Sequence, residues 1–221
     1  THTDSSAASD VYKRQVEAPS IDLFKALGLY TITVISGLAL MILFYVTIVR
    51  IITGKKIGNF LKGISPAQLL AFSTSSSAAT LPVTMECVTD KLDVEEEVSS
   101  FVLPIGATIN MDGTSLYQAV AAVFIAQAFG IDLNFGAQIG IILTATLASI
   151  GSAAVPGAGM VMLVIVLAQA GIPEAGLALI FAVDRPLDMC RTSINVTGDA
   201  SVSMIVSKPV SYTHLRAHET S

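Results

Sequence analysis

Hydrophobic residues form long runs along this chain, and short polar segments separate them. No ionisable residue occurs between Lys25 and Arg50, and the residues in between are rich in Leu, Ile, Val and Thr. About 20 apolar helical residues are enough to cross a hydrocarbon core of about 30 Å. The pattern therefore predicts a membrane-spanning helix over residues 26–50.

Two other apolar stretches are interrupted by small polar residues, glycine or proline. Residues 63–89 contain "STSSSAATLP", and residues 136–170 contain "GSAAVPGAG". Non-helical backbone at membrane depth is tolerated only where protein buries it or where it lines a cavity. We interpret each stretch as a re-entrant hairpin of two short helices, with arms of about ten residues in the first hairpin. The two hairpins are expected to enter from opposite faces.

Between the hairpins, residues 98–130 are apolar except at "GATINMDGTS". A carboxylate inside a span costs several kcal/mol unless it is partnered, so Asp112 in this position indicates a functional site. The flanking Gly106 and Gly113 favour local unwinding, which frees carbonyl oxygens. Hard cations such as sodium prefer oxygen ligands of this kind. The segment is therefore predicted to be an unwound helix.

The last apolar segment, residues 175–207, carries a group of polar side chains. On a helix, six of them fall within an arc of about 100°. They are Asp184, Asp188, Arg191, Thr192, Asn195 and Asp199. Charge facing lipid is expensive, so this stripe is expected to face a pocket, where Arg191 offers a planar fork for a carboxylate and Asp188 an acceptor for an ammonium group. Ion pairs that only stabilise a helix end are the alternative interpretation.

The composition is typical of a membrane protein. Of the 221 residues, 52% are hydrophobic and 13% are charged, and the mean hydropathy is +0.70. Four basic residues follow the first span, and the positive-inside tendency places their loop in the cytoplasm. They are Arg50, Lys55, Lys56 and Lys62. Because no basic stripe or nucleic-acid motif is present, no nucleic-acid partner is expected.

The two ends of the chain differ from everything between them. Residues 1–15 and 209–221 are polar and patternless, and they resemble translated cloning or sequencing-adapter sequence. All three histidines lie in these tails. We therefore expect both tails to be non-native and restrict functional reasoning to residues 16–208.

Four segments, in order and in register, carry a family resemblance. They are "SSSAATLP", "GATINMDGT", "ASIGSAAVPGAG" and "DRPLDMCRTSINVTGDA". They resemble the signature motifs of the dicarboxylate/amino acid:cation symporter family, the glutamate transporters, over residues 20–208. The resemblance implies an all-α integral membrane protein of the cell (inner) membrane, with several spanning helices, two oppositely oriented re-entrant helical hairpins and an unwound helix.

The resemblance also implies the organisation of the parent protein. Residues 16–208 would be a partial transport domain from the C-terminal half of a homotrimer. This domain would carry substrate through the lipid bilayer by an elevator movement, and the second hairpin would be the extracellular gate. The scaffold helices that form the trimer would lie outside this chain.

The family's substrate-binding residues carry over to matching positions. The resemblance implies that Arg191 binds the side-chain carboxylate of the substrate with help from Thr114, and that Asp188 holds its amino group. The expected site of the main carboxylate consists of Ser76, Ser77, backbone amides near Val155 and Gly159, and Asn195. Thr192 completes the substrate-binding set.

Sodium is the coupling ion that the resemblance implies, without any other cofactor; protons are the alternative. The first sodium site would consist of Gly106, Asn110, Asn195 and Asp199. The second would consist of carbonyls of Thr108, Ser149, Ile150 and Ser152. A third would use Asn110 and Asp112, with further ligands from an earlier helix. One departure is Ser75, where archaeal relatives carry an arginine; Arg185 is expected to supply that charge.

The predicted function is sodium-coupled symport of aspartate or glutamate. The alternative is proton-coupled symport of C4-dicarboxylates such as succinate, fumarate or malate. Asp188 favours an amino acid, because a dicarboxylate has no amino group. Arg191 argues against neutral substrates, since an unpaired buried guanidinium would be costly.

An intramembrane enzyme is a remote alternative. A serine hydrolase needs a base, and residues 16–208 contain no histidine. An aspartyl protease needs two carboxylates that share a proton, without an arginine one turn away. The chain is therefore not expected to be an enzyme, and a gated carrier fits these residues better than an ion channel.

Overall fold

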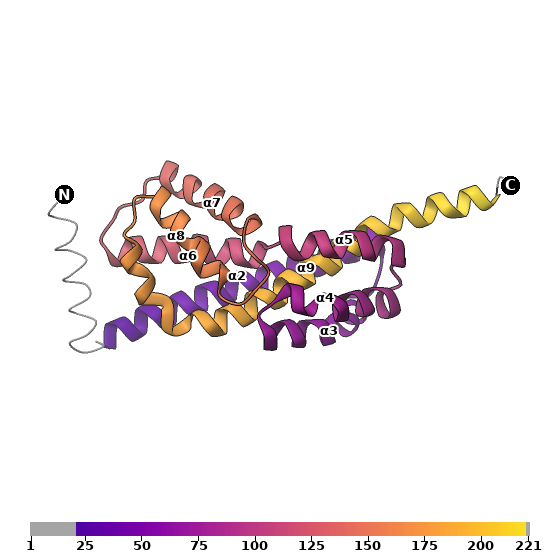
Figure 1. The fold of residues 1–221 in the computed structure, drawn as a ribbon, viewed down its shortest axis with the longest axis horizontal. Coiled ribbons are helices and arrows are strands. Elements are labelled where there is room, and N and C mark those ends of the chain that lie inside the picture. The colour runs from indigo at the N-terminus through magenta and orange to yellow at the C-terminus, as the bar shows by residue number, and fades with distance from the viewer. Residues whose placement is uncertain (1–20, 220–221) are drawn as a thin grey trace.

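The computed structural model describes the backbone of residues 21–219 and the side chains of residues 21–208. The regular elements in this range are all helical (Figure 1). They are α2 (Ile21–Thr53), α3 (Ile57–Thr74), α4 (Ser77–Glu86), the π-helical turn η1 (Cys87–Lys91), α5 (Glu96–Ile109), α6 (Asp112–Ala128), α7 (Phe135–Ile150), α8 (Ala158–Gln169), the 3₁₀ turn η2 (Glu174–Gly176) and α9 (Leu177–Glu219). The all-α prediction is confirmed for these residues. The expected tail 1–15 lies outside them.

Helix α2 has the length and composition of a membrane span. It has 33 residues, about 50 Å at 1.5 Å per residue, and its most apolar window has a mean hydropathy of 2.5. Within residues 21–219 it is the one helix that meets both criteria. One face packs against the protein through Tyr30, Val34, Leu38, Tyr45 and Val49, whereas large apolar side chains such as Leu40 and Phe44 are exposed on the other.

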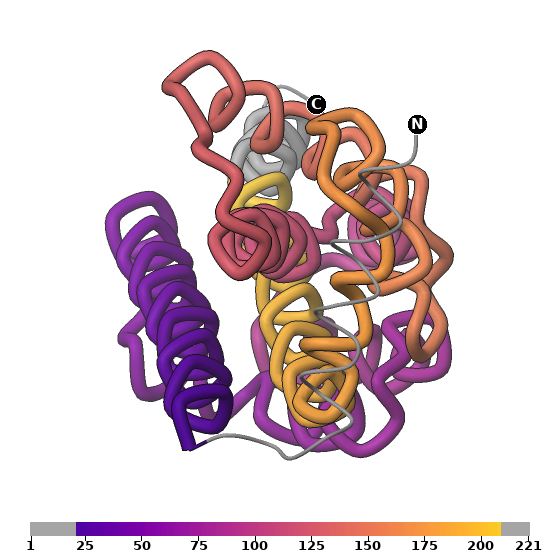
Figure 2. Tube along the Cα trace, turned by 90° about the vertical axis from the view of Figure 1, so that its left-hand side faces the viewer, coloured from indigo at the N-terminus to yellow at the C-terminus, as the bar shows by residue number. Residues whose placement is uncertain are grey.

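Helix α9 runs through the centre of the molecule and contacts α2, α3, α5 and α6 (Figure 1). Seen from the end, α2 lies on one side of the molecule, and the helix pair α7–α8 lies on the other (Figure 2). Two apolar clusters pack along α9. One joins α2 to α6, α7 and α8, and the other joins the end of α2 to α3, η1 and α5. The polar stripe of α9 lies where the two clusters meet.

The helix boundaries differ from the expected ones at two places. The first arm of the first hairpin, α3, has 18 residues instead of about ten. It continues through Pro66 because Phe60, Ile64 and Ala67 are buried against the second cluster. Helix α9 continues beyond residue 207 to Glu219, and no glycine follows Gly198 to end it.

The expected unwound helix is divided in the structure. Helix α5 ends at Ile109 and α6 begins at Asp112, so that Asn110 and Met111 connect them. The break is short, because the amide of Asn110 still donates to the carbonyl oxygen of Gly106 at 2.8 Å. The side chain of Asn110 therefore lies at an interruption between two helices that face α9.

Candidate functional site

The tip of the first hairpin is a two-residue turn of serines. Ser75 adopts a left-handed conformation, with φ of 52°, and Ser76 is the N-cap of α4. The Ser76 hydroxyl accepts a hydrogen bond from the amide of Ala79 and donates one to the carbonyl oxygen of Ala154, at 2.7 Å. Because Ala154 belongs to the α7–α8 connection, the two hairpin tips are in direct contact.

The tip of the second hairpin contacts α9. Gly157 has a φ of +78°, a conformation that favours glycine, and it begins α8. Its amide donates to Oδ2 of Asp188 at 2.8 Å. This bond fixes the hairpin tip above the polar stripe of α9.

Arg191 lies beneath this tip and is 1% exposed. Its Nε donates to Oδ1 of Asp188 at 3.0 Å, and its Nη1 lies 3.3 Å from Oδ1 of Asp184. The guanidinium carbon stacks 4.0 Å from the ring centre of Tyr117, whose hydroxyl also donates to Asp184. Two carboxylates and an aromatic face therefore hold one buried cation in place.

One nitrogen of this guanidinium remains available. Nη2 of Arg191 is buried and has no hydrogen-bond partner among the described residues. A Cβ at Gly159 would lie 3.0 Å from this atom, so the absence of a side chain there leaves room beside it. A buried donor without a partner is costly, and a bound carboxylate would satisfy it.

Asn195 connects the stripe to α6. Its Oδ1 accepts from the amide of Gly113 at 2.8 Å, and its Nδ2 donates to the hydroxyl of Thr114 at 3.3 Å. Gly113 permits this close approach, because a Cβ there would lie 2.8 Å from the carbonyl oxygen of Arg191. The start of α6 is thus packed directly on α9.

These residues enclose a cavity of about 20 Å³ between the two tips, α6 and α9. Its lining includes seven of the expected substrate-binding residues: Ser77, Thr114, Val155, Gly159, Asp188, Thr192 and Asn195. The other two adjoin it, since Ser76 bonds to the lining residue Ala154 and Arg191 to the lining residue Asp188. The volume suffices for about one water molecule, so a larger ligand requires movement of a hairpin.

A second group of oxygen atoms lies one turn further along α9. We call Asn110, Asp112, Asn195 and Asp199 the cation cluster. Nδ2 of Asn110 donates to Oδ1 of Asp199 at 2.9 Å and lies 3.4 Å from the carbonyl oxygen of Asn195. Asp199 is buried, and a Cβ at Gly106 would come within 2.6 Å of its Oδ1. Asp112 is exposed in this chain and accepts a hydrogen bond from Tyr45 of α2.

The donor set of the cation cluster suits a hard cation. Carboxylate, amide and carbonyl oxygens are the atoms present. No group of three or more His, Cys, Asp or Glu side chains that could hold a metal occurs within the described range. The residues therefore fit sodium, which needs oxygen ligands from backbone as well as side chains.

The second expected sodium set lies between α5 and α7, which contact each other. The hydroxyls of Thr108 and Ser149 bond within their own helices, to the carbonyl oxygens of Ile105 and Thr146. Ile150 is exposed, whereas the Ser152 hydroxyl is buried and has no partner among the described residues. Besides backbone carbonyls, the Ser152 hydroxyl is therefore the one side-chain oxygen of this set that is buried without a partner among the described residues.

Arg185 lies at the edge of the site. Its Nη1 is 3.7 Å from Oδ2 of Asp188, and its side chain is 55% exposed. Ser75 is buried and lines the cavity. Arg185 thus pairs with the lining residue Asp188 from the solvent side and does not itself line the cavity.

Three residues with structural roles at the site were not predicted. Tyr117 stacks on Arg191, Tyr45 bonds to Asp112, and the Gln118 side chain donates to the carbonyl oxygen of Gly159 at 2.9 Å. Each is a polar side chain within an apolar run of sequence, the same signal that identified Asp112.

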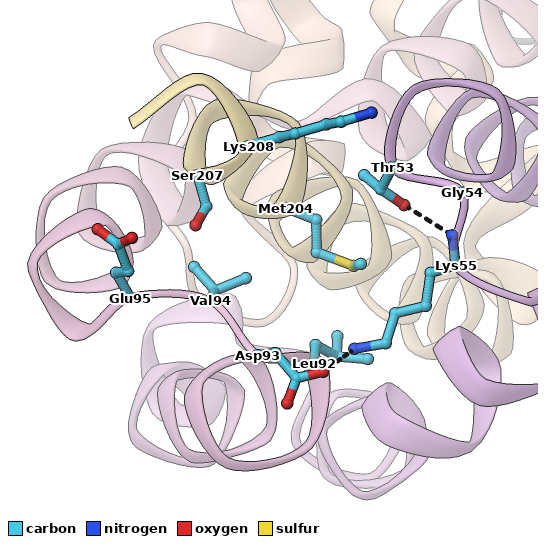
Figure 3. Close-up of a pocket in the computed structure, with 10 residues that line it drawn as sticks. All are labelled: Thr53, Gly54, Lys55, Leu92, Asp93, Val94, Glu95, Met204, Ser207 and Lys208. Carbon is cyan, nitrogen blue, oxygen red and sulfur yellow. Dashed lines mark hydrogen bonds and ion pairs between the residues drawn. The ribbon is translucent and has the colours of Figure 1, made fainter. Parts of the chain in front are cut away.

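A larger cavity of about 570 Å³ lies where residues 53–55 at the end of α2, residues 92–95 and residues 204–208 of α9 come together (Figure 3). Its charged lining includes Lys55 and Asp93, whose side chains form an ion pair at 2.8 Å. None of the expected substrate or sodium residues lines it. The smaller cavity is therefore the candidate site.

A helical protein with two contacting hairpins, a broken helix and a buried arginine–carboxylate group has the features of a membrane transporter. The model of the sodium:dicarboxylate symporter family matches residues 11–209. The chain belongs to this family. The membership places it among membrane transporters rather than enzymes, and the family resemblance of its motifs is confirmed.

Curated relatives agree with this membership. The chain is 50% identical over 186 residues to the excitatory amino acid transporter of Caenorhabditis elegans, covering 84% of this chain and 37% of the relative. It is 50% identical over 194 residues to excitatory amino acid transporter 3 of Mus musculus, covering 87% and 37%. For excitatory amino acid transporter 5 of Homo sapiens the identity is 50% over 184 residues, covering 83% and 33%. The chain thus spans little more than a third of these relatives.

Proposed function

We propose that this chain is part of the transport domain of a sodium-coupled symporter for acidic amino acids. The observation that carries the proposal is the free Nη2 of Arg191, which is buried beside Gly159, a residue that lines the small cavity. A carboxylate bound there receives a charge-assisted hydrogen bond in a site that excludes water. The printed names of the similar proteins, excitatory amino acid transporters, support the same substrate class.

The charges of the site favour a substrate that carries both signs. Asp184 and Asp188 together give two negative charges against the one positive charge of the buried Arg191. An ammonium group can pair with Asp188, and a carboxylate can accept a hydrogen bond from the free donor of Arg191, so each charged end of the substrate has a partner of opposite sign. Thr114 would then assist Arg191 at the side-chain carboxylate, and Thr192 and Asn195 would contact the backbone of the amino acid; all three line the cavity.

Movement of the α7–α8 hairpin would admit the substrate. Among the hydrogen bonds described above, two hold the α7–α8 connection to the rest of the site, Gly157 to Asp188 and Ala154 to Ser76, while Gln118 holds Gly159 in the first turn of α8. Opening the tip breaks both and enlarges a cavity that now accommodates about one water molecule. The ammonium group of the substrate would replace the Gly157 amide at Asp188.

Sodium supplies the positive charge that balances the cation cluster when substrate is bound. Asp199, Asn110 and the carbonyl oxygen of Asn195 would hold it on one side of α9, with Asp112 nearby. Asn195 also bonds to Gly113 and Thr114 at the substrate cavity. The same residue therefore belongs to both groups, which offers a direct physical connection between ion and substrate binding.

Family membership also supports a proposal for the wider architecture. We infer that residues 16–208 are a C-terminal piece of a longer, multi-pass protein of the cell membrane. In this arrangement the two hairpins enter from opposite faces, scaffold helices outside this chain form a homotrimer, and the transport domain moves as an elevator.

A proton-coupled carrier of C4-dicarboxylates is the second candidate; the name of the matching family supports its dicarboxylate substrate, whereas the ion in that name is sodium. The two functions differ in whether Asp188 needs an ammonium partner. Uptake of labelled L-aspartate into liposomes containing the full-length protein distinguishes them. An inward sodium gradient should drive uptake, and choline in its place should abolish it. Uptake that needs only an acidic exterior and is competed by succinate would support the second candidate.

A further inference from the structure

Tyr45 extends from α2 to the start of α6, outside the substrate cavity. Its hydroxyl donates a hydrogen bond to Oδ2 of Asp112, and the tyrosine side chain is buried. A carboxylate has two oxygens, and a single donor to one of them leaves the other oxygen free. The bond can therefore fix the orientation of the carboxylate without occupying both of its ligand atoms.

The same hydroxyl lies beside the other members of the cation cluster. A Cβ at Gly198 would come within 2.7 Å of the Tyr45 hydroxyl and 2.6 Å of Nδ2 of Asn110. The absence of a side chain at Gly198 thus leaves space for both groups against α9. Tyr45 thus bonds to Asp112 and lies beside Asn110, which in turn bonds to Asp199.

We propose that Tyr45 is a positioning residue for the cation cluster, holding the Asp112 carboxylate in the orientation that binds sodium. An oriented ligand needs no reorganisation when the ion arrives, and loss of such support typically weakens metal binding. The arrangement also makes α2 a participant in cation binding. This inference rests on the proposed function, because it requires a sodium-coupled protein.

The variant Tyr45→Phe in the full-length protein tests the role. It removes the hydroxyl and keeps the ring. The measurement is the rise in melting temperature with sodium concentration, without substrate, for the detergent-solubilised protein. The sodium concentration that gives half of the full shift should increase about tenfold, the effect expected for loss of a hydrogen bond to a charged group.

Tyr30→Phe is the matched control. Tyr30 is a buried tyrosine on the same helix, but its ring stacks on Phe124 at 4.9 Å and its hydroxyl has no hydrogen-bond partner among the described residues. Removal of the Tyr30 hydroxyl should leave the dependence of the melting temperature on sodium concentration unchanged. A similar shift in both variants would show a general effect on α2 and would overturn the inference.

A double-mutant cycle shows whether Tyr45 acts through Asp112. Asp112→Asn should weaken the sodium response, and adding Tyr45→Phe should change it no further. Additive effects, or a Tyr45→Phe protein that melts earlier but keeps the wild-type sodium dependence, would overturn the positioning role. If the wild-type protein itself shows no sodium response, sodium coupling is contradicted and this inference with it.

Discussion

The hydroxyl of Ser76 donates a hydrogen bond to the carbonyl oxygen of Ala154, 78 residues further along the chain, at 2.7 Å. This bond joins the tips of the two hairpins over the small cavity. Ser76 is also the N-cap of α4 through the amide of Ala79. One side chain thus stabilises the first hairpin and closes it against the second.

Ser76→Ala should therefore weaken closure of the site. Loss of a buried hydrogen bond is worth about 1 kcal/mol, which predicts a roughly fivefold rise in the dissociation constant of aspartate. Calorimetric titration in sodium measures it. Ser73→Ala is the control, because the exposed Ser73 hydroxyl bonds only to Leu69 of its own helix. An equal loss of affinity in both variants would argue against tip-to-tip closure.

The polar stripe of α9 was the part of the site most accessible to prediction from sequence. Helical periodicity fixes which side chains share a face, so Asp188, Arg191 and Asn195 could be grouped from spacing alone. All three are buried together in the structure. The short break at Asn110 and Met111 also has a local signal, in the polar residues and glycines around it.

Contacts between distant segments could not be predicted in the same way. Tyr45 and Asp112 are 67 residues apart, and so are Tyr117 and Asp184. No local periodicity connects such pairs, because they depend on how whole helices pack. The length of α3 was also missed, since the small polar residues and the proline of "STSSSAATLP" suggested two arms of about ten residues, whereas burial against α9 and η1 extends α3.

Arg191→Ala should abolish aspartate uptake. The substitution removes the guanidinium that binds the substrate carboxylate. It also leaves Asp184 and Asp188 buried without their counter-charge, which lowers the free energy of unfolding by about 3–5 kcal/mol. Arg191→Lys keeps the charge but lacks the planar fork, and it should fold while binding aspartate at least tenfold more weakly. Uptake and melting temperature, measured together, separate the two effects.

Arg185→Ala provides the comparison for these variants. Its side chain is half exposed and its nitrogen lies 3.7 Å from Asp188, so solvent screens the pair. The expected loss of affinity is below about fivefold. A loss of aspartate affinity as large as that of Arg191→Lys would mean that Arg185, rather than Arg191, supplies the positive charge that binds the substrate carboxylate.

Gly159→Ala should interfere with substrate binding rather than with folding of α8. The new Cβ would lie 3.0 Å from both Nη2 of Arg191 and Cγ2 of Thr114, and it would fill the space beside the free donor. We expect a loss of aspartate affinity of about fivefold or more, an overpacking effect of about 1–3 kcal/mol. Gly58→Ala is the control: nothing lies within 4 Å of its Cβ position on α3, and affinity should not change. Unchanged affinity in Gly159→Ala would contradict the proposed binding of a substrate carboxylate at Nη2 of Arg191, beside Gly159.

Gly106→Ala should act on sodium instead. A Cβ there would come within 2.6 Å of Oδ1 of Asp199, so the carboxylate must move away from Asn110. The sodium concentration needed for half-maximal uptake should rise about tenfold or more, because displaced ligands bind a cation poorly. Gly28→Ala on α2, with open space at its Cβ position, should behave as the wild type. Sodium dependence that is unaffected by Gly106→Ala would place the ion elsewhere.

The recognition of both ends of an acidic amino acid is the central claim, and competitive binding to the full-length protein in sodium tests it most directly. L-aspartate presents two carboxylates and an ammonium group, succinate lacks the ammonium group, and L-asparagine lacks the side-chain carboxylate. Unpaired buried polar groups should disfavour both analogues, so we predict that each binds at least 100-fold more weakly than aspartate. Succinate binding as tightly as aspartate would contradict the role of Asp188, and asparagine binding as tightly would contradict the role of Arg191.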